Sequence, residues 1–138
     1  MTEISRRRIM VVTFSLVAAA AVSAVAPPRA AAANGAKIAR IFRGQMLTAK
    51  ADEYERYITP GIEKILATPG NQGVTVLRRA EGDRTEFLVV SYWESIDAVK
   101  RFAGEDYQKP VLLPRDREFL VDEPSVFHYQ VKREDRRP

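Results

Sequence analysis

The segment of residues 86–102 constrains the fold most strongly, because it joins a strand to a helix with almost no linker. Phe87 to Trp93 is apolar on both alternate faces, a pattern typical of a strand that is covered on both sides. Ser95 is a favourable N-cap, and the apolar residues after it recur at helical spacing until Gly104. We therefore expect a buried central strand that leads directly into an amphipathic helix.

The rest of the chain predicts a short alternation of strands and helices. Pro60-Gly61 interrupts the first helical pattern, so that helix is either kinked there or divided into two. The expected elements are strands over residues 37–46, 74–80, 85–93 and 125–131, with helices over residues 51–66 and from residue 95. This order of strand, helix, strand, strand, helix, strand predicts an α+β fold, the ferredoxin-like split βαβ sandwich.

In such a sandwich the two helices cover one face of the sheet, and the other face needs a different cover. That second face is also apolar, through combinations such as Val89 or Val90 with Val126 or Phe127. An apolar sheet face left open on a domain of this size would promote association. The sequence therefore predicts a homodimer packed sheet to sheet.

Residues 1–33 have the organisation of a secretory leader and linker. Three arginines, Arg6 to Arg8, precede a moderately apolar run, and small residues near Ala30 to Ala33 suit cleavage. The order Ser-Arg-Arg-x-Ile-Met resembles the twin-arginine export motif. An ordinary secretory signal and an uncleaved membrane anchor are the alternatives. We expect residues 34–138 to form one exported domain, periplasmic or extracellular, that contacts membrane only through the leader.

Charge and composition exclude several classes of site. The net charge of +4 invites a nucleic-acid partner, but four of the 22 basic residues and one of the 18 acidic residues precede residue 34. The remaining 18 basic and 17 acidic residues nearly balance, so we expect no nucleic-acid binding. The chain has no cysteine and one histidine, which excludes thiolate chemistry and argues against a histidine-based zinc site.

Six short segments carry a family resemblance, at residues 38–44, 68–73, 76–79, 92–95, 102–106 and 127–131. Together they resemble the antibiotic biosynthesis monooxygenase (ABM) family. The resemblance implies a dimeric α+β barrel and a cofactor-independent monooxygenase acting on a small aromatic or quinone-like substrate. The same fold also hosts proteins of other activities. A non-catalytic dimer that binds a small ligand, and a haem-binding protein, are therefore alternative functions.

Two residues are candidates for catalysis, Trp93 and His128. Family oxygenases and haem degraders often have a pocket tryptophan where Trp93 stands, although a large aromatic at a strand end also packs a helix onto a sheet. His128 is the sole imidazole, so it would have to serve as any histidine base or haem ligand, or else as a hydrogen-bonded strand residue.

Tyrosines and arginines could orient a phenolic substrate between the sheet and the helices. The candidates for this substrate pocket are Arg43, Tyr54, Tyr92 and Tyr107, with Arg40, Tyr57 and Tyr129 as further members of the same set. Family haem degraders pair the tryptophan with an asparagine in the first strand and a histidine after the second helix. In this chain the first strand has no asparagine, and the segment of residues 107–114 that follows the second helix has no histidine. We therefore predict no cofactor, and haem is less favoured.

Overall fold

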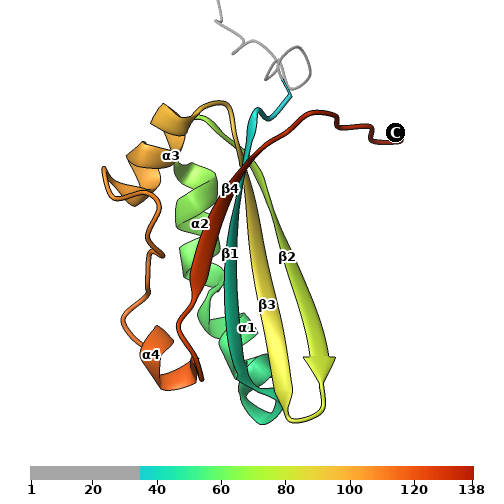
Figure 1. Ribbon diagram of the computed structural model, residues 1–138, viewed down its shortest axis with the longest axis vertical. Helices are drawn as coiled ribbons and strands as arrows, with labels where there is room; N and C mark the ends of the chain where they lie inside the picture. Colours follow the sequence, from blue (N-terminus) through green and yellow to red (C-terminus); the bar gives the residue numbers. More distant parts are fainter. Residues whose placement is uncertain (1–34) are drawn as a thin grey trace, which may run out of the picture.

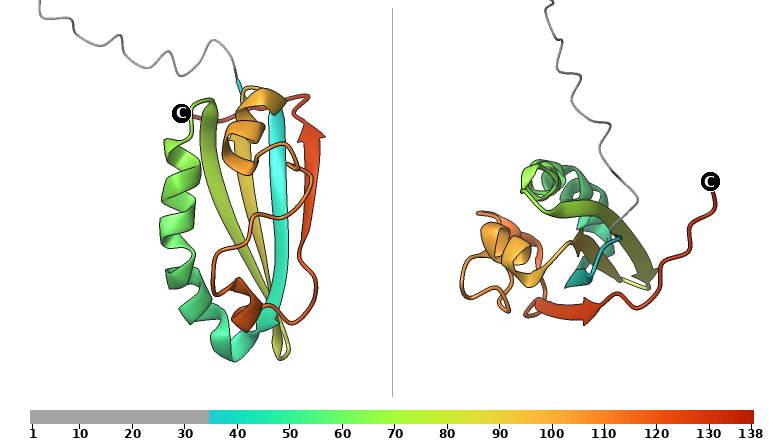
Figure 2. Two further views of the ribbon diagram at one scale, coloured as in Figure 1. Left: turned by 90° about the vertical axis from the view of Figure 1, so that its left-hand side faces the viewer. Right: turned by 90° about the horizontal axis from the view of Figure 1, so that it is seen from above.

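The computed structural model describes residues 35–138, so the predicted leader and the linker that follows it lie outside the described residues. The elements are β1 (Ile38–Leu47), η1 (Thr48–Lys50), α1 (Ala51–Tyr57), α2 (Thr59–Ala67), β2 (Asn71–Glu81), β3 (Arg84–Trp93), α3 (Ile96–Ala103), α4 (Asp116–Phe119) and β4 (Ser125–Gln130). The four strands form one antiparallel sheet in the order β2-β3-β1-β4. The helices lie together on one side of this sheet (Figures 1 and 2). The predicted α+β ferredoxin-like fold is confirmed.

The junction between β3 and α3 has the predicted form. The Ser95 hydroxyl accepts a hydrogen bond from the Ala98 amide at 3.1 Å, which satisfies one of the free donors at the helix start. Gly104 ends α3 with a φ of 80°, a conformation that glycine adopts without steric cost. Val99 and Ala98 are fully buried, so α3 presses its apolar side onto the end of the sheet.

One segment settles an alternative that the sequence left open, and another differs from its predicted bounds. The first helical pattern is divided in two, with Pro60 in the first turn of α2, where its missing N–H costs nothing. β2 begins at Asn71, three residues before the predicted start. The Asn71 side chain accepts from the Gly73 amide at 2.9 Å and donates to the Tyr92 carbonyl at 3.2 Å. These bonds continue the pairing of β2 with β3 through a bulge between Asn71 and Gly73, where Gln72 is the extra residue.

The core lies between the sheet and the helices, in two clusters. One surrounds Tyr54 of α1 and Phe87 of β3, whose rings meet edge to face at 5.2 Å. The other surrounds Trp93 and Val99 under α3. Among the described residues no helix is long and apolar enough to cross a membrane.

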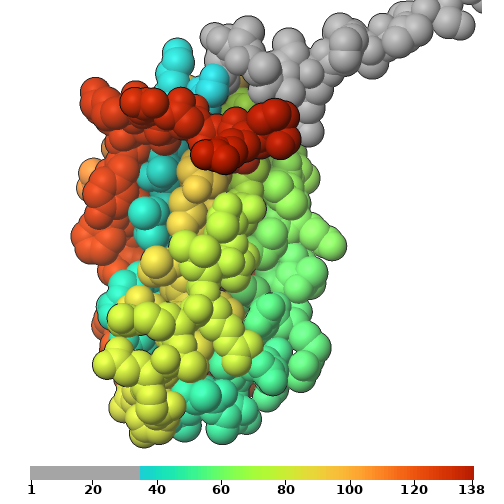
Figure 3. Space-filling model, turned by 90° about the vertical axis from the view of Figure 1, so that its right-hand side faces the viewer, coloured from blue at the N-terminus to red at the C-terminus, as the bar shows by residue number. Residues whose placement is uncertain are grey.

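The opposite face of the sheet carries no helix among the described residues. Figure 3 shows the four strands open to view there, with the C-terminal segment crossing one end. Several apolar side chains are exposed on these strands, with exposed fractions of 48% for Leu77, 52% for Phe127 and 54% for Tyr129. We call this surface the open face.

Candidate functional site

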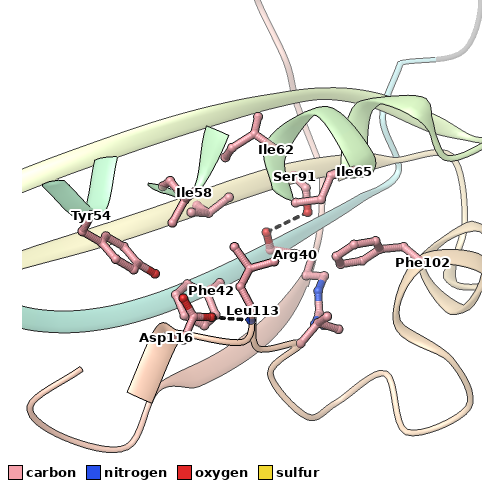
Figure 4. Close-up of a pocket in the computed structure, with 12 residues that line it drawn as sticks. Arg40, Phe42, Tyr54, Ile58, Ile62, Ile65, Ser91, Phe102, Leu113 and Asp116 are labelled. Carbon is pink, nitrogen blue, oxygen red and sulfur yellow. Dashed lines mark hydrogen bonds between the residues drawn. The ribbon is translucent and has the colours of Figure 1, made fainter. Parts of the chain in front are cut away.

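A cavity opens between the sheet and the helices, on the side opposite the open face. The centre of a water-sized sphere can occupy about 70 Å³ within it, and the cavity is partly open to solvent. The lining residues are Arg40, Phe42, Tyr54, Ile58, Ile62, Ile65, Val89, Ser91, Phe102, Val111, Leu113 and Asp116. The wall is therefore mainly apolar with a few polar groups, which is the usual character of a small-molecule site. Figure 4 shows Tyr54 and Asp116 towards one end and Arg40 and Phe102 towards the other.

Arg40 is the main charged group at its end of the cavity. It occupies an inward position on β1, and only 4% of its surface is exposed. The guanidinium donates hydrogen bonds to the carbonyls of Tyr107 at 2.5 Å and Lys109 at 3.2 Å. Burial lowers the Arg40 pKa to about 10, so the group still carries its positive charge at neutral pH. Arg40 thereby holds the segment after α3 against the sheet and brings a cation to the cavity.

His128 lies beside Arg40 on the neighbouring strand, as the register Arg40↔His128 requires. Its Nε2 is 3.0 Å from the Arg40 Nη1. Because a guanidinium can only donate, the imidazole must accept through Nε2 and is neutral. Burial, and then the charge of Arg40, lower the His128 pKa. The Tyr107 ring contacts this imidazole edge to face, with ring centres 5.1 Å apart.

Asp116 is the main polar group at the other end. One carboxylate oxygen accepts from the Leu113 amide at 2.7 Å, while the other is buried without a hydrogen-bond partner among the described residues. Burial raises the Asp116 pKa, and the hydrogen bond from Leu113 opposes that rise. Burial also raises the pKa of the Tyr54 phenol at this end, with the Asp116 charge as a second cause. Burial therefore disfavours the ionised form of both groups.

Trp93 is close to the cavity but is not among its lining residues. It is fully buried, and its indole N–H donates to the Ser91 hydroxyl at 2.8 Å. Its ring stacks on Phe102 with centres 5.9 Å apart. Ser91 and Phe102 both line the cavity. Trp93 thus packs against two residues that line the cavity without lining it itself.

The four tyrosine and arginine candidates for the pocket lie on different sides of the sheet. Tyr54 lines the cavity. Tyr107 contacts Arg40 and His128 but does not line the cavity. Arg43 pairs with Glu86 at 2.5 Å, and both strand positions alternate away from the cavity onto the open face. Tyr92 alternates to that face as well and contacts the Arg136 guanidinium. The structure does not bring Arg43 or Tyr92 together with Tyr54.

Sequence reasoning missed Asp116 and gave Arg40 only a secondary place. Asp116 follows Arg115 in a charged, proline-flanked segment, where an acidic residue resembles an ordinary helix N-terminal residue. Its burial depends on the packing of α4 against β1, which no local pattern reports. Arg40 was detectable in principle, because a charge at an inward position between Ile38 and Phe42 breaks the alternation of the strand.

Comparisons with solved structures support the same fold at low identity. A Nitrosomonas europaea protein described as a putative antibiotic biosynthesis monooxygenase is 14% identical, with 71% of this chain and 92% of that chain covered and a TM-score of 0.55. A Streptomyces coelicolor monooxygenase in complex with nanaomycin D is 19% identical, with coverages of 75% and 93% and a TM-score of 0.50. A haem-degrading protein of Mycobacterium tuberculosis, solved free of haem, is 20% identical, with coverages of 72% and 97% and a TM-score of 0.50.

At these identities the structural likeness establishes the fold alone. No curated protein matches the chain. The family model described as antibiotic biosynthesis monooxygenase matches residues 38–110, which include β1, the helices α1 to α3 and the β2–β3 hairpin. That match spans more than half of the sequence, and the chain belongs to the antibiotic biosynthesis monooxygenase (ABM) family.

Proposed function

We propose that this protein is a cofactor-independent monooxygenase that oxidises a small hydroxylated aromatic or quinone-like substrate in the cavity beside Arg40. The observation that carries the proposal is an apolar cavity with a buried cation, Arg40, and a buried carboxyl group, Asp116. Family membership and a monooxygenase among the structural neighbours support it. The overall reaction converts a phenol and dioxygen to a quinone and water, so the substrate supplies all four electrons.

The residues around the cavity suit the first step of such a reaction. Loss of the phenolic proton makes the ring electron-rich enough to react with dioxygen, and a nearby cation favours that loss by stabilising the phenolate. Arg40 supplies the cation, and His128 holds the guanidinium in place through its neutral Nε2. Trp93 keeps Ser91 and Phe102 in position, so we assign it a positioning role rather than contact with substrate.

Oxygen uptake with a panel of phenols and naphthols tests this proposal. Ile62→Trp should fill the cavity and abolish uptake, because Ile62 lines it. Leu66→Trp is the matched control, since Leu66 lies one turn later on α2 and is 46% exposed. Uptake that survives Ile62→Trp would contradict the proposed site. Ligand binding without any uptake would favour the non-catalytic binding protein instead.

A haem-binding function is the alternative that this site fits less well. His128 is not among the lining residues, and its Nε2 would have to leave Arg40 before it could bind iron through that atom. We therefore propose that the cavity functions without haem. Protein purified from cells supplied with haem precursors should lack a Soret band, and a band that disappears in His128→Ala would overturn this part of the proposal.

We also propose that the open face forms a homodimer. The exposed apolar side chains Leu77, Phe127 and Tyr129 support this, because a patch of that kind on a sheet favours association with a like surface. Sedimentation should give twice the monomer mass, and a monomer at micromolar concentration would contradict it.

Export remains a proposal that rests on the sequence of residues 1–33. A reporter fused behind these residues should leave the cytoplasm by the twin-arginine route. Replacing Arg6 and Arg7 by lysine should keep the reporter in the cytoplasm. Arg29→Lys, a matched change outside the motif, should leave export unchanged. Export that ignores Arg6 and Arg7 would favour an ordinary secretory signal.

A further inference from the structure

The buried cation of the cavity has only neutral partners among residues 35–138. The hydrogen bonds of the Arg40 guanidinium go to two backbone carbonyls and to the imidazole of His128. Its carbon lies 5.9 Å from the centre of the Phe102 ring, which also lines the cavity. A buried charge without a counter-charge is costly, and proteins normally pair it. An anion bound in the cavity would supply the missing charge.

The carboxyl group at the far end has a complementary gap. Asp116 is 2% exposed, and one of its oxygens has no hydrogen-bond partner in the described part of the chain. A hydroxyl group on a ligand could donate to that oxygen and remove the cost of an unsatisfied buried acceptor. Between Arg40 and Asp116 the wall is apolar, formed by residues such as Phe42 and Ile58 (Figure 4).

We propose that the cavity selects an aromatic monoanion that carries a separate hydroxyl group, with its anionic oxygen on Arg40 and its hydroxyl on Asp116. The proposal rests on the proposed function for the location of the site and narrows its substrate class. The anionic oxygen can belong to a carboxylate, a phenolate or an enolate, because a guanidinium donates to each of them. A neutral aromatic of the same shape would leave the Arg40 charge uncompensated.

Calorimetric titration of the wild-type protein without dioxygen tests the proposal directly. The probes are 4-hydroxybenzoate, its uncharged amide 4-hydroxybenzamide, and benzoate, which lacks the hydroxyl. The corresponding two-ring set based on 6-hydroxy-2-naphthoate covers a longer site. We expect the hydroxy acid to bind about tenfold or more tightly than its amide, and more tightly than the acid without the hydroxyl. Equal affinity for acid and amide, or no binding of either hydroxy acid at millimolar concentration, would overturn the proposal.

Two variants assign the preferences to their residues. Arg40→Gln should abolish the preference for acid over amide, and Arg40→Lys should keep most of it. Asp116→Leu, which removes both carboxylate oxygens, should abolish the preference for the hydroxylated acid and leave the charge preference unchanged. If Arg40→Gln does not fold, the ligand pairs on the wild-type protein still decide the question. A charge preference that persists in folded Arg40→Gln would place the anion elsewhere and contradict the assignment.

The two proposals fail separately, because the titration involves no turnover. A clear acid preference without oxygen uptake on any phenol would leave the ligand class standing and remove the oxygenase. Oxygen uptake on neutral and anionic phenols alike, with no difference in affinity, would leave the oxygenase standing and remove the ligand class.

Discussion

The two faces of the sheet differ in what covers them, although both are rich in apolar residues. On the helix side Phe87 and Met46 are fully buried, and the buried charged group on the same side, Arg40, is held by hydrogen bonds to two backbone carbonyls. On the open face Phe127 and Tyr129 remain more than half exposed. Because successive strand residues point to opposite faces, adjacent positions of β1 and β3 line the cavity on one side of the sheet and belong to the open face on the other. Hydrophobicity alone therefore does not identify the core. Whether a face of the sheet is buried depends on whether helices pack against it.

The largest expected effect separates the two faces by stability. Phe87→Ala should lower the free energy of unfolding by about 3–5 kcal/mol, because it leaves a cavity beside the Tyr54 ring. Phe127→Ala should cost less than about 1 kcal/mol in the monomer, since its side chain is already half exposed. Denaturant titration at low protein concentration checks both values. Similar losses at the two positions would remove the distinction between the faces.

The next effect concerns association through the open face. Leu88→Arg places a charge on the central strand β3, and we expect it to raise the dimer dissociation constant about a hundredfold or more. Leu66→Arg on α2 is the control, because Leu66 is exposed on the helix side. Analytical ultracentrifugation over a concentration series measures the constant. A dimer weakened equally by both changes would place the interface elsewhere.

A smaller effect arises from His128 on the helix side. Its pKa is lowered in the folded protein, so the unfolded chain binds the proton more readily and stability falls as the pH drops below about 6.5. The groups that face the imidazole are the Arg40 guanidinium, which repels its proton, and the Tyr107 ring. Between neutral pH and pH 5, His128→Gln should lose less stability than the wild-type protein. Tyr129→Gln, on the open face, should lose as much stability between neutral pH and pH 5 as the wild-type protein does. An equal loss of stability in His128→Gln would contradict this account.

The smallest effect is expected at Asp116. Burial raises its pKa, so the ionised carboxylate costs folding free energy at neutral pH, and this cost disappears once both states are protonated in acid. Asp116→Asn should therefore raise the free energy of unfolding by up to about 1 kcal/mol at neutral pH and leave it unchanged in acid. Glu118→Gln, a change at an exposed carboxylate of the same helix, should give no such gain. A loss of stability in Asp116→Asn at neutral pH would contradict the assigned burial cost.

The fold could be predicted from the sequence because its signals are local. Ser95, Gly104 and the alternation of residues 87–93 each report a backbone conformation within a few residues. The site could be predicted only in part. Tyr54 was identified by type, whereas the pairing of Arg40 with His128 joins residues 88 positions apart, and the burial of Asp116 depends on how α4 docks. Such contacts arise from strand order and packing, which no short motif encodes.

Mapping the amide chemical shifts of the protein during titration with 4-hydroxybenzoate tests the central claim most directly, because it observes both faces at once. We expect the largest shifts around Arg40, Ser91 and Asp116, which line the cavity, and small shifts at Leu77 and Phe127 on the open face. Large shifts confined to the open face would contradict the assignment of the cavity as the functional site.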